Sequence, residues 1–386
     1  MNLLILTSRF PFPIDKGDKL RIYYQIVELS KIYNIHLISI SDIKIDQSAK
    51  DEMEKYCSSV HVYKINLINR TFNLLRTFIN NKPFQVNYFY SLSIQKKIDQ
   101  KIKEIKPDHI FCQLIRMAWY LKGQFKIPST LDYMDAFSKG IERRVDKSPF
   151  WKKPLFMMEH ERLKSFENLA FEFFQNHCII SNSDLEFIFH EKKHLIQVIP
   201  NGINTEYFSK NKYDIKYDLV FTGNLNYAPN INAATYICKE IYPLLKIKFP
   251  TIKILIVGSN PSSRVKKLAN NDITIKGWQD DIRKSYCSGK IFFAPMRIGT
   301  GLQNKLLEAM SLEIPCVTSS LANQSLQANH KENIYIGDST NECISIISYL
   351  LKHEEIRDEI GKKGRKFVLE NFSWKKSTDQ LIEIIN

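Results

Sequence analysis

Short apolar runs alternate with amphipathic segments along this chain of 386 residues. In the first half, residues 3–7 and 35–40 are expected to be strands, and residues 19–32 between them a helix with Asp18 as its N-cap. A later run over residues 109–112 is apolar enough for the centre of a sheet. Strands that alternate with helices are typical of parallel sheets with helical crossovers, so the pattern predicts an α/β fold.

The second half repeats the pattern more clearly. Its strand candidates are short apolar runs bounded by polar segments: residues 219–222, 253–257, 273–276, 291–294 and 316–318. Because a chain of this length exceeds the usual size of one hydrophobic core, we expect two doubly wound domains. Sheets of this kind bind ligands outside the carboxyl ends of their strands.

A turn-rich segment over residues 199–208, followed by a polar stretch, marks the expected junction between the domains. The sequence predicts an N-terminal domain over residues 1–204, a linker over residues 205–217 and a C-terminal domain over residues 218–371. The last segment, residues 372–386, is expected to form a helix.

Composition narrows the classes of function. The hydrophobic content of 44% suffices for two cores, and without a run of 18 apolar residues or a signal peptide we expect a cytoplasmic protein. The seven cysteines are scattered without a C-x-x-C spacing, which predicts reduced core thiols. The net charge of +14 favours an anionic partner, but it is spread over both halves and does not distinguish nucleic acid, a membrane surface or a phosphorylated substrate.

The run over residues 292–310 combines a buried strand, a glycine turn and a charged helix start. At helical spacing, Asn304, Lys305 and Glu308 share one face. The opposite face is apolar and consists of Leu302, Leu306, Ala309 and Met310. Backbone N–H groups at a helix start favour a phosphate, the lysine adds a positive charge, and the glutamate can accept hydrogen bonds from sugar hydroxyls. The run predicts a nucleotide diphosphate site, and the alternative is an ordinary exposed ion pair behind a strand-to-helix turn.

A second glycine-containing loop, residues 8–19, follows the first strand. Gly17 would let the backbone approach a ligand closely, and Arg21, one turn into the helix, could contact a phosphate. Asp15 and Lys16 lie in the same loop, at the expected carboxyl edge of the sheet. The alternative is a plain strand-to-helix connection.

Polar residues also follow two other strands of the first half. Asp132 or Asp135 could orient a sugar hydroxyl, and Arg116 could hold an acceptor phosphate or pair with one of these acids. A buried structural network of aspartate and arginine is an alternative that these residues leave open.

These motifs together resemble the GT-B glycosyltransferases of family four, the glycosyl transferases of group one. The order of Gly-rich loop, helix and Glu-Ala-Met in residues 299–310 resembles their nucleotide-sugar site. Residues 8–19 resemble the opening of bacterial polysaccharide and exopolysaccharide sugar transferases, residues 199–202 the interdomain segment, and residues 277–281 the loop whose backbone contacts the nucleotide base. The resemblance implies the GT-B fold, with two Rossmann-like domains facing across a cleft and a C-terminal helix that crosses back to the N-terminal domain.

The resemblance also implies roles for individual residues. The donor would be bound in the second domain and the acceptor mainly by the first. The donor-binding residues would be Gly17, Gly223, Asn224, Gly277, Trp278, Arg297, Gly299, Thr300, Gly301, Lys305 and Glu308. The catalytic residues would be Asp132, Asp135 and Arg116, and the acceptor-binding residues Asp15, Lys16 and Arg21.

Two positions depart from the family pattern. Many members carry two glutamates eight positions apart, but the position that precedes Glu308 by eight holds Thr300. Many members also carry an arginine and a lysine after the first strand of the second domain, but the turn over residues 223–230 has no cation. We hypothesise that Arg297 and Lys305 supply this charge from the opposite loop.

Neither a metal nor a cofactor is expected. The chain has no D-x-D carboxylate pair, and His190 and His194 are its only histidines at a ligand spacing. This agrees with metal-independent GT-B chemistry. The resemblance implies transfer with retention of the anomeric configuration, in which the departing phosphate deprotonates the incoming hydroxyl.

The expected activity is that of a hexosyl or glycosyltransferase in cell-surface polysaccharide biosynthesis. It would move a sugar from a nucleotide-diphosphate sugar to a glycan or a lipid-linked acceptor. One rival is a nucleotide-sugar epimerase on the same scaffold, which needs more acid-base side chains than the sequence offers. The other is a nucleic-acid-binding protein, for which the chain carries a basic charge but no motif.

Two amphipathic stretches predict contact with an anionic membrane surface. They are residues 70–79 and residues 139–156, and the second holds six basic and two acidic residues beside Phe150, Trp151 and Phe156. A peripheral position on the inner face of the membrane is therefore a further expectation. The alternative is an ordinary core helix and a solvated loop.

Overall fold

In the computed structural model, the chain forms two compact units. Unit 1 comprises Met1–Gly202 and Trp374–Asn386, and unit 2 comprises Ile203–Ser373. The structure describes residues 1–65, 71, 73–74, 76–77, 80–123, 126–209, 214–298 and 302–386, without the side chains of residues 143, 146 and 147. The first unit therefore ends two residues before the predicted boundary, and the last helix of the chain belongs to it.

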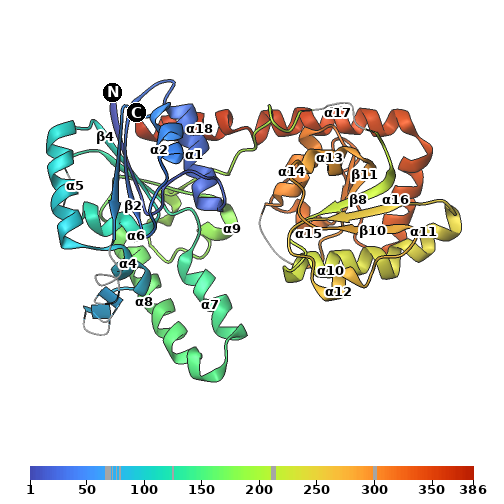
Figure 1. Cartoon of the computed structure of the whole chain (residues 1–386), viewed down its shortest axis with the longest axis horizontal. Coiled ribbons are helices and arrows are strands. Elements are labelled where there is room, and N and C mark those ends of the chain that lie inside the picture. The colour runs from blue at the N-terminus through green and yellow to red at the C-terminus, as the bar shows by residue number, and fades with distance from the viewer. Residues whose placement is uncertain are drawn as a thin grey trace. The chain divides into compact units, whose positions relative to one another are not determined.

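Unit 1 is built on a parallel sheet of seven strands in the order β3-β2-β1-β4-β5-β6-β7 (Figure 1). The strands are β1 (Asn2–Thr7), β2 (Asn34–Ser41), β3 (Ser59–Lys64), β4 (His109–Gln113), β5 (Ser129–Asp132), β6 (Asn176–Ile179) and β7 (Gln197–Val198). The first strand pairs with β2 on one side, where Leu3 lies opposite Ile35, and with β4 on the other, where Leu3 lies opposite His109. The strand order thus reverses between β1 and β4, which is the doubly wound topology.

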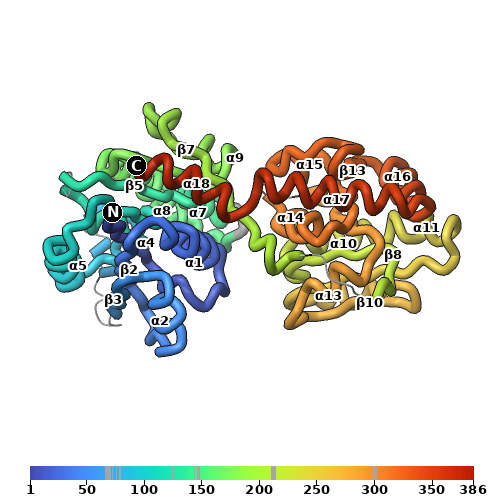
Figure 2. Tube along the Cα trace, turned by 90° about the horizontal axis from the view of Figure 1, so that it is seen from above, coloured from blue at the N-terminus to red at the C-terminus, as the bar shows by residue number. Residues whose placement is uncertain are grey.

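Helices cover both faces of this sheet. They are α1 (Gly17–Leu29), α2 (Gln47–Glu54), α4 (Phe84–Phe89), α5 (Leu92–Ile105), α6 (Ile115–Ala118), α7 (Phe137–Lys147), α8 (Lys153–Phe171), α9 (Asn182–Leu185) and α18 (Trp374–Ile385). Figure 2 shows α18, in red, beside α1, in blue. Trp374 of α18 stacks on Tyr24 of α1 with 5.2 Å between the ring centroids, so the last helix of the chain packs on the first.

Unit 2 repeats the arrangement with a parallel sheet of six strands in the order β10-β9-β8-β11-β12-β13. The strands are β8 (Tyr217–Thr222), β9 (Ile254–Val257), β10 (Ile273–Lys276), β11 (Gly289–Ala294), β12 (Cys316–Thr318) and β13 (Tyr335–Ile336). The helices are α10 (Ala228–Tyr236), α11 (Tyr242–Lys248), α12 (Ser263–Lys266), α13 (Ile282–Cys287), α14 (Asn304–Ser311), α15 (Ser320–Asn323), α16 (Thr340–Lys352) and α17 (Glu354–Asn371). Here the strand order reverses between β8 and β11.

The predicted pair of doubly wound α/β domains is confirmed, and the strands predicted in the second half coincide with β8 to β12 to within two residues at either end. The prediction for the start of the first helix is wrong. This helix begins at Gly17 with Lys16 at the N-cap position. Asp18 does not cap it, because the Asp18 carboxylate accepts a hydrogen bond from the Arg9 guanidinium at 2.7 Å.

Both faces of the unit 1 sheet are buried in apolar cores. Along β1, Leu3 and Ile5 pack into one cluster of buried side chains, and Leu4 and Leu6 pack into another. Successive residues of a strand point to opposite faces, so the two clusters lie on opposite sides of the sheet. None of the seven cysteines forms a disulfide and six of them are buried, as predicted for reduced core thiols.

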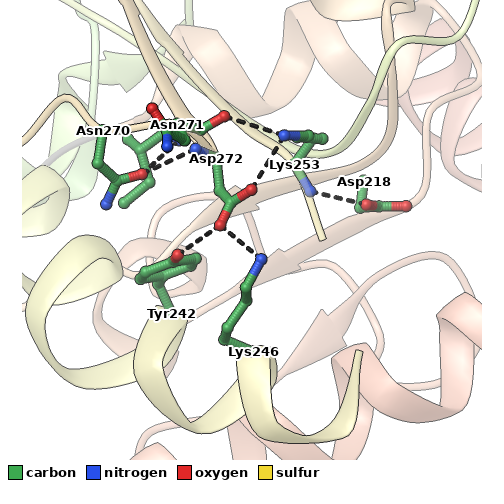
Figure 3. Close-up of polar contacts among 8 residues, drawn as sticks. Asp218, Tyr242, Lys246, Lys253, Asn270, Asn271 and Asp272 are labelled. Carbon is green, nitrogen blue, oxygen red and sulfur yellow. Dashed lines mark hydrogen bonds and ion pairs between the residues drawn. The ribbon is translucent and has the colours of Figure 1, made fainter. Parts of the chain in front are cut away.

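A polar cluster around Asp272 joins three segments at the amino ends of β8, β9 and β10 (Figure 3). The Asp272 carboxylate accepts hydrogen bonds from the Tyr242 hydroxyl at 2.7 Å, from Lys246 Nζ at 2.5 Å and from Lys253 Nζ at 2.9 Å. The backbone N–H of Lys253 donates to the Asp218 carboxylate at 2.9 Å. The hydrogen bonds from Lys246, Lys253 and Tyr242 hold the pKa of Asp272 well below its ordinary value of 3.8.

We expect Asp272→Asn to lower the stability of unit 2 in a pH-dependent manner. Because the folded-state pKa is depressed, the ionised carboxylate stabilises the fold above pH 3.8, and this contribution is lost as the pH falls further. The variant should therefore unfold at a lower urea concentration than wild type at pH 7, and the difference should shrink below about pH 4. Asp358→Asn, an exposed change on α17, is the control. An equal difference for Asp272→Asn at pH 7 and pH 3 would contradict this account.

Candidate functional site

A cavity of about 430 Å³ opens at the carboxyl ends of the strands of unit 2. Thr222 ends β8, Ser259 follows β9 and Trp278 follows β10. Lys305 and Glu308 reach the same cavity from α14, the helix behind β11. The cavity thus lies where the strand order reverses, which is where doubly wound sheets bind ligands.

The helix α14 divides its faces as the sequence predicts. Leu306, Ala309 and Met310 are at most 1% exposed and pack in the core of unit 2. Lys305 and Glu308 are half-buried and line the cavity. Packing of the apolar face therefore fixes the two polar side chains at the edge of the sheet.

The ammonium group of Lys305 points to the turn that follows β8. Its Nζ lies 2.5 Å from Oδ1 of Asn230, to which it donates a hydrogen bond, and 5.0 Å from the centroid of the Phe221 ring. Burial lowers the pKa of Lys305 to about 8. A cation from α14 thus reaches the turn over residues 223–230, which carries no cation of its own.

Glu308 ends a short chain of hydrogen bonds. The hydroxyl of Tyr286 donates to Glu308 Oε2 at 2.6 Å, and Oγ1 of Thr222 donates to the Tyr286 oxygen at 2.7 Å. Burial raises the pKa of Glu308 to about 7, although the hydrogen bond from Tyr286 opposes this shift. The carboxyl group is held in place by protein donors and is poised to change its protonation state near neutral pH.

Two glycines bring the turns after β8 and β9 together. A Cβ atom added to Gly258 would lie 1.7 Å from the carbonyl oxygen of Gly223, so a larger residue does not fit there. This close approach places Gly223, Asn224 and Gly258 in the wall of the cavity.

Other predicted donor residues do not line this cavity. Arg297 pairs with Glu240 at 3.6 Å, and its guanidinium lies over the Tyr236 ring at 4.8 Å. The Arg297 half of the charge hypothesis stays a prediction, because Arg297 is not among the described residues that line the cavity. Gly277 precedes the lining residues without joining them, and Gly17 at the start of α1 lines neither cavity described here. The remaining predicted donor residues, Gly299, Thr300 and Gly301, lie outside the described residues.

Unit 1 has a cavity of about 660 Å³ at the carboxyl ends of its own strands. Asp15 and Lys16 reach it from the loop after β1, Asp42 from the loop after β2, and Arg116 from α6, which follows β4. Two predicted acceptor residues and one predicted catalytic residue therefore line the same cavity.

Arg21 and Asp132 form a buried ion pair away from both cavities. Arg21 Nε donates to the Asp132 carboxylate at 2.6 Å, and Arg21 Nη1 donates to the carbonyl oxygen of Ile199 and to Asn201 Oδ1, both at 2.9 Å. Both side chains are 0% exposed, so neither is available to a substrate. The structure thus corrects the acceptor role of Arg21 and the catalytic role of Asp132 and supports the structural alternative.

Asp135 lies three residues beyond the end of β5 and is exposed. Protein atoms crowded around its carboxylate, together with the charge of Asp184, raise its pKa to about 6. Asp135 does not line the unit 1 cavity, but it follows a strand that ends at the same sheet edge.

Several residues of the two cavities were not predicted. Asn230 carries no charge that would mark it in the turn after β8, although a buried ammonium needs an acceptor such as its amide oxygen. Tyr286, on α13, has no local signal, because its partners Glu308 and Thr222 are distant in sequence. Arg144 belongs to the basic stretch over residues 139–156, and that charge run was the signal that could have assigned it to a site.

Two further predictions concern metal sites and membranes. Within the described part of the chain, no three side chains of His, Cys, Asp or Glu gather into a metal site. None of the helices formed by the described residues is long and apolar enough to cross a membrane. Half of the first amphipathic stretch, residues 70–79, lies outside the described residues, namely residues 70, 72, 75, 78 and 79. The second stretch, residues 139–156, forms a helical hairpin of α7 and α8.

Residues 216–353, which span most of unit 2, match the family model of glycosyl transferases group 1. The whole chain superposes on solved structures that share its fold. A glycosyltransferase from Rickettsia africae matches with a TM-score of 0.65 and 15% identity over 99% of this chain and 97% of that one. The chain is a glycosyltransferase with the GT-B fold.

Two other matches are informative about this glycosyltransferase. The structure of HepE of Anabaena in complex with UDP matches with a TM-score of 0.65 and 14% identity over 99% of both chains. The structure of HepE in complex with UDP-glucose matches with a TM-score of 0.63 and 12% identity over 99% of this chain and 98% of that one. An uncharacterized 44.6 kDa protein in the cps region of Klebsiella pneumoniae is 26% identical over 97% of both chains.

We expect the affinity for a nucleoside diphosphate to fall as the pH rises from 6 to 9. Glu308 gains negative charge near pH 7 and Lys305 loses positive charge near pH 8, and both changes disfavour an anion in the cavity. Lys305→Met should weaken UDP binding about 10- to 100-fold at pH 7, since a charge-assisted hydrogen bond contributes about 1.5–3 kcal/mol. Calorimetric titration with UDP at each pH measures both effects.

Lys362→Met, which removes an exposed lysine from α17, is the matched control for the change in net charge. It should leave both the affinity and its pH dependence as in wild type. The role assigned to Lys305 would be refuted if Lys305→Met bound UDP as tightly as this control.

Proposed function

We propose that this glycosyltransferase moves a sugar from a nucleoside diphosphate sugar to a hydroxyl group of a glycan or lipid-linked acceptor. The observation that carries the proposal is the unit 2 cavity, in which Lys305 and Glu308 stand together at the switch point of the sheet. Lys305 would pair with the diphosphate, and Glu308 would accept hydrogen bonds from hydroxyl groups of the donor. The UDP and UDP-glucose complexes of HepE support a nucleotide-sugar donor.

The acceptor would bind in the unit 1 cavity, against Asp15, Lys16 and Arg116. Asp135, whose pKa of about 6 leaves it mostly ionised at neutral pH, would orient the acceptor hydroxyl. The reaction would proceed with retention. In this mechanism the sugar–phosphate bond breaks while the acceptor oxygen bonds to the same face of the anomeric carbon, and the departing phosphate takes the hydroxyl proton.

Charge on the leaving diphosphate would be stabilised by Lys305 and by backbone N–H groups at the start of α14, without a metal ion. The similarity to a protein in the cps region of Klebsiella pneumoniae supports a role in the biosynthesis of a cell-surface polysaccharide. The enzyme would act in the cytoplasm, on acceptors at the inner face of the membrane.

The proposal is tested first by a thermal-shift panel of UDP-, GDP-, ADP- and CMP-sugars. A donor at 100-fold excess over its dissociation constant should stabilise the protein by about 2.7 kcal/mol, and EDTA should not change the shift. The effective donor is then incubated with extracts of lipid-linked and soluble glycans, and NMR of the early product should give the anomeric configuration of the donor.

Three results would count against the proposal. Absence of any thermal shift across the panel would contradict the proposed donor site. A product with the inverted anomeric configuration would contradict the retaining mechanism. Epimerised sugar formed from the donor alone, without an acceptor, would favour the epimerase.

A further inference from the structure

Among the described residues, the unit 1 cavity carries more positive than negative side chains. The described cations that line it are Arg9, Lys16, Lys19, Arg116 and Arg144. The described acids are Asp15, Asp42 and Glu159. An excess of cations on a concave surface of low polarity concentrates a positive potential there.

Each of these acids already has a protein partner. Asp15 pairs with Lys19 at 2.8 Å, Asp42 accepts a hydrogen bond from the Tyr88 hydroxyl at 3.0 Å, and Glu159 accepts the backbone N–H of Phe84 at 2.7 Å. Among the described residues, none of the three lies within ion-pair distance of Arg116 or Arg144. The positive charge of these two arginines is therefore not neutralised inside the cavity.

Arg116 is held rigidly and is incompletely bonded. Its Nε and Nη2 donate to Oε1 of Gln85 at 3.0 and 2.8 Å, and its guanidinium lies over the Phe137 ring at 4.7 Å. The third nitrogen, Nη1, is buried and has no hydrogen-bond partner among the described residues. A buried N–H without an acceptor is costly, and an anion entering the cavity would relieve that cost after a small side-chain adjustment.

Arg116 also lies near other cations. Burial and the neighbouring Arg9 lower the pKa of Arg116 to about 10, although the charges of Asp18 and Asp135 oppose this shift, so it stays charged at neutral pH. Arg9 is paired with Asp18 at 2.7 Å, whereas Arg144 is exposed and makes no ion pair among the described residues. Repulsion between these guanidinium groups falls when an anion binds between them.

Most of the remaining cavity wall is apolar. Phe10, Ile43, Phe84, Phe89, Leu155 and Phe156 contribute to it. A free inorganic anion would use the arginines but not this wall, and an uncharged glycan would use neither well. A phosphate attached to a hydrocarbon chain fits both parts.

We propose that the unit 1 cavity binds the phosphate or diphosphate group of a lipid-linked acceptor through Arg116 and Arg144, with the hydrocarbon chain along the apolar wall. This inference rests on the proposed function, because it names the chemical class of the acceptor. It selects the lipid-linked acceptor over a free glycan.

Calorimetric titration with farnesyl diphosphate, farnesol and inorganic diphosphate tests the inference. Farnesyl diphosphate should bind at least tenfold more tightly than either of the other two. Arg144→Gln, at an exposed residue with no ion pair, should weaken the binding of farnesyl diphosphate about tenfold and leave farnesol unaffected. Arg116→Gln should weaken it further. Arg264→Gln, an exposed change on α12 of unit 2, is the control and should have no effect.

The inference is overturned if farnesyl diphosphate binds no better than farnesol, or if Arg144→Gln matches Arg264→Gln. Equal binding of inorganic and farnesyl diphosphate would show a free-phosphate site and overturn the lipid-linked part. These titrations use no nucleotide sugar. Failure of the donor panel would therefore refute the proposed function without affecting the titration results. Failure of the farnesyl diphosphate titrations would refute this inference and leave the nucleotide-sugar donor site standing.

A different observation concerns the hairpin of α7 and α8. Figure 1 shows these helices side by side, projecting away from the sheet of unit 1. At the hairpin tip, the 3₁₀ segment η2 (Phe150–Lys152) exposes 84% of Phe150 and 65% of Trp151. Leu155 and Met157 on the next turn are 44% and 57% exposed. So many large apolar side chains in water mark a surface that is covered by a partner.

Charge indicates which partner covers this tip. The stretch over residues 139–156 holds six basic and two acidic residues, and Lys152 and Lys153 are exposed beside the aromatic rings. Aromatic side chains flanked by lysines are suited to the interface of an anionic bilayer, where the rings enter the headgroup region and the lysines pair with lipid phosphates. Leu155 also belongs to the wall of the unit 1 cavity, so docking of the tip would place that cavity beside the headgroups.

We infer that the hairpin tip, residues 149–157, docks unit 1 onto an anionic lipid bilayer. Sedimentation with vesicles of phosphatidylglycerol and phosphatidylcholine should capture the wild-type protein at low salt, and pure phosphatidylcholine or high salt should release it. Phe150→Ala with Trp151→Ala should reduce capture about tenfold or more, whereas Phe189→Ala, at another exposed aromatic residue of unit 1, should not.

Tryptophan fluorescence gives an independent readout. Vesicles should shift the emission of wild type to the blue, and Trp151→Phe should remove that shift while the other three of the four tryptophans remain. Capture that is unchanged in the Phe150 and Trp151 double variant would overturn the inference. So would self-association in solution that the same variant abolishes, because the tip would then bind a second copy of the chain.

Discussion

In each unit, the parallel sheet is buried on both of its faces, and the rest of the structure depends on this constraint. Along β1, Leu3 and Leu4 point to opposite faces and both are at most 1% exposed, so no side of the strand is left for polar chemistry. The polar side chains that line the cavities come mainly from the loops and helices at the strand ends. Both cavities lie at the carboxyl ends of the strands, where the connections on either side of the switch point lead to opposite faces of the sheet. The Asp272 cluster lies at the amino ends of the strands of unit 2.

The two cavities differ in their charge. Among the described residues that line the unit 2 cavity, Lys305 is the one cation and Asp280 and Glu308 are the acids. A diphosphate would therefore depend strongly on the protonation of Glu308, because an ionised carboxylate one helical turn from Lys305 offsets part of its charge. The pKa of about 7 for Glu308 reduces this conflict near neutral pH. The unit 1 cavity has an excess of cations instead, which suits an acceptor that brings its own negative charge.

The sequence predicts much of the fold because burial on both faces leaves a local signal. The runs that became β9 and the second half of β11 are continuous and apolar, and α14 shows its two faces at helical spacing. Side-chain partners leave no such signal when they are distant in sequence. Arg21 and Asp132 are 111 residues apart and each looks like a site residue at a strand end, yet they neutralise one another. Arg297 likewise has an acidic partner that its sequence context does not reveal, Glu240.

The buried pair of Arg21 and Asp132 still serves the site, although it contacts no substrate. Through its hydrogen bonds, Arg21 joins α1 to the end of β5 and to the backbone at Ile199. The loop before α1 carries Asp15 and Lys16, and the loop after β5 carries Asp135, so the pair fixes the origin of both loops. Two charges removed from water cost several kcal/mol each unless their geometry is well satisfied, and here the guanidinium makes four hydrogen bonds. Such a pair contributes less to net stability than to holding a single arrangement, which is what a cavity built from three separate loops requires.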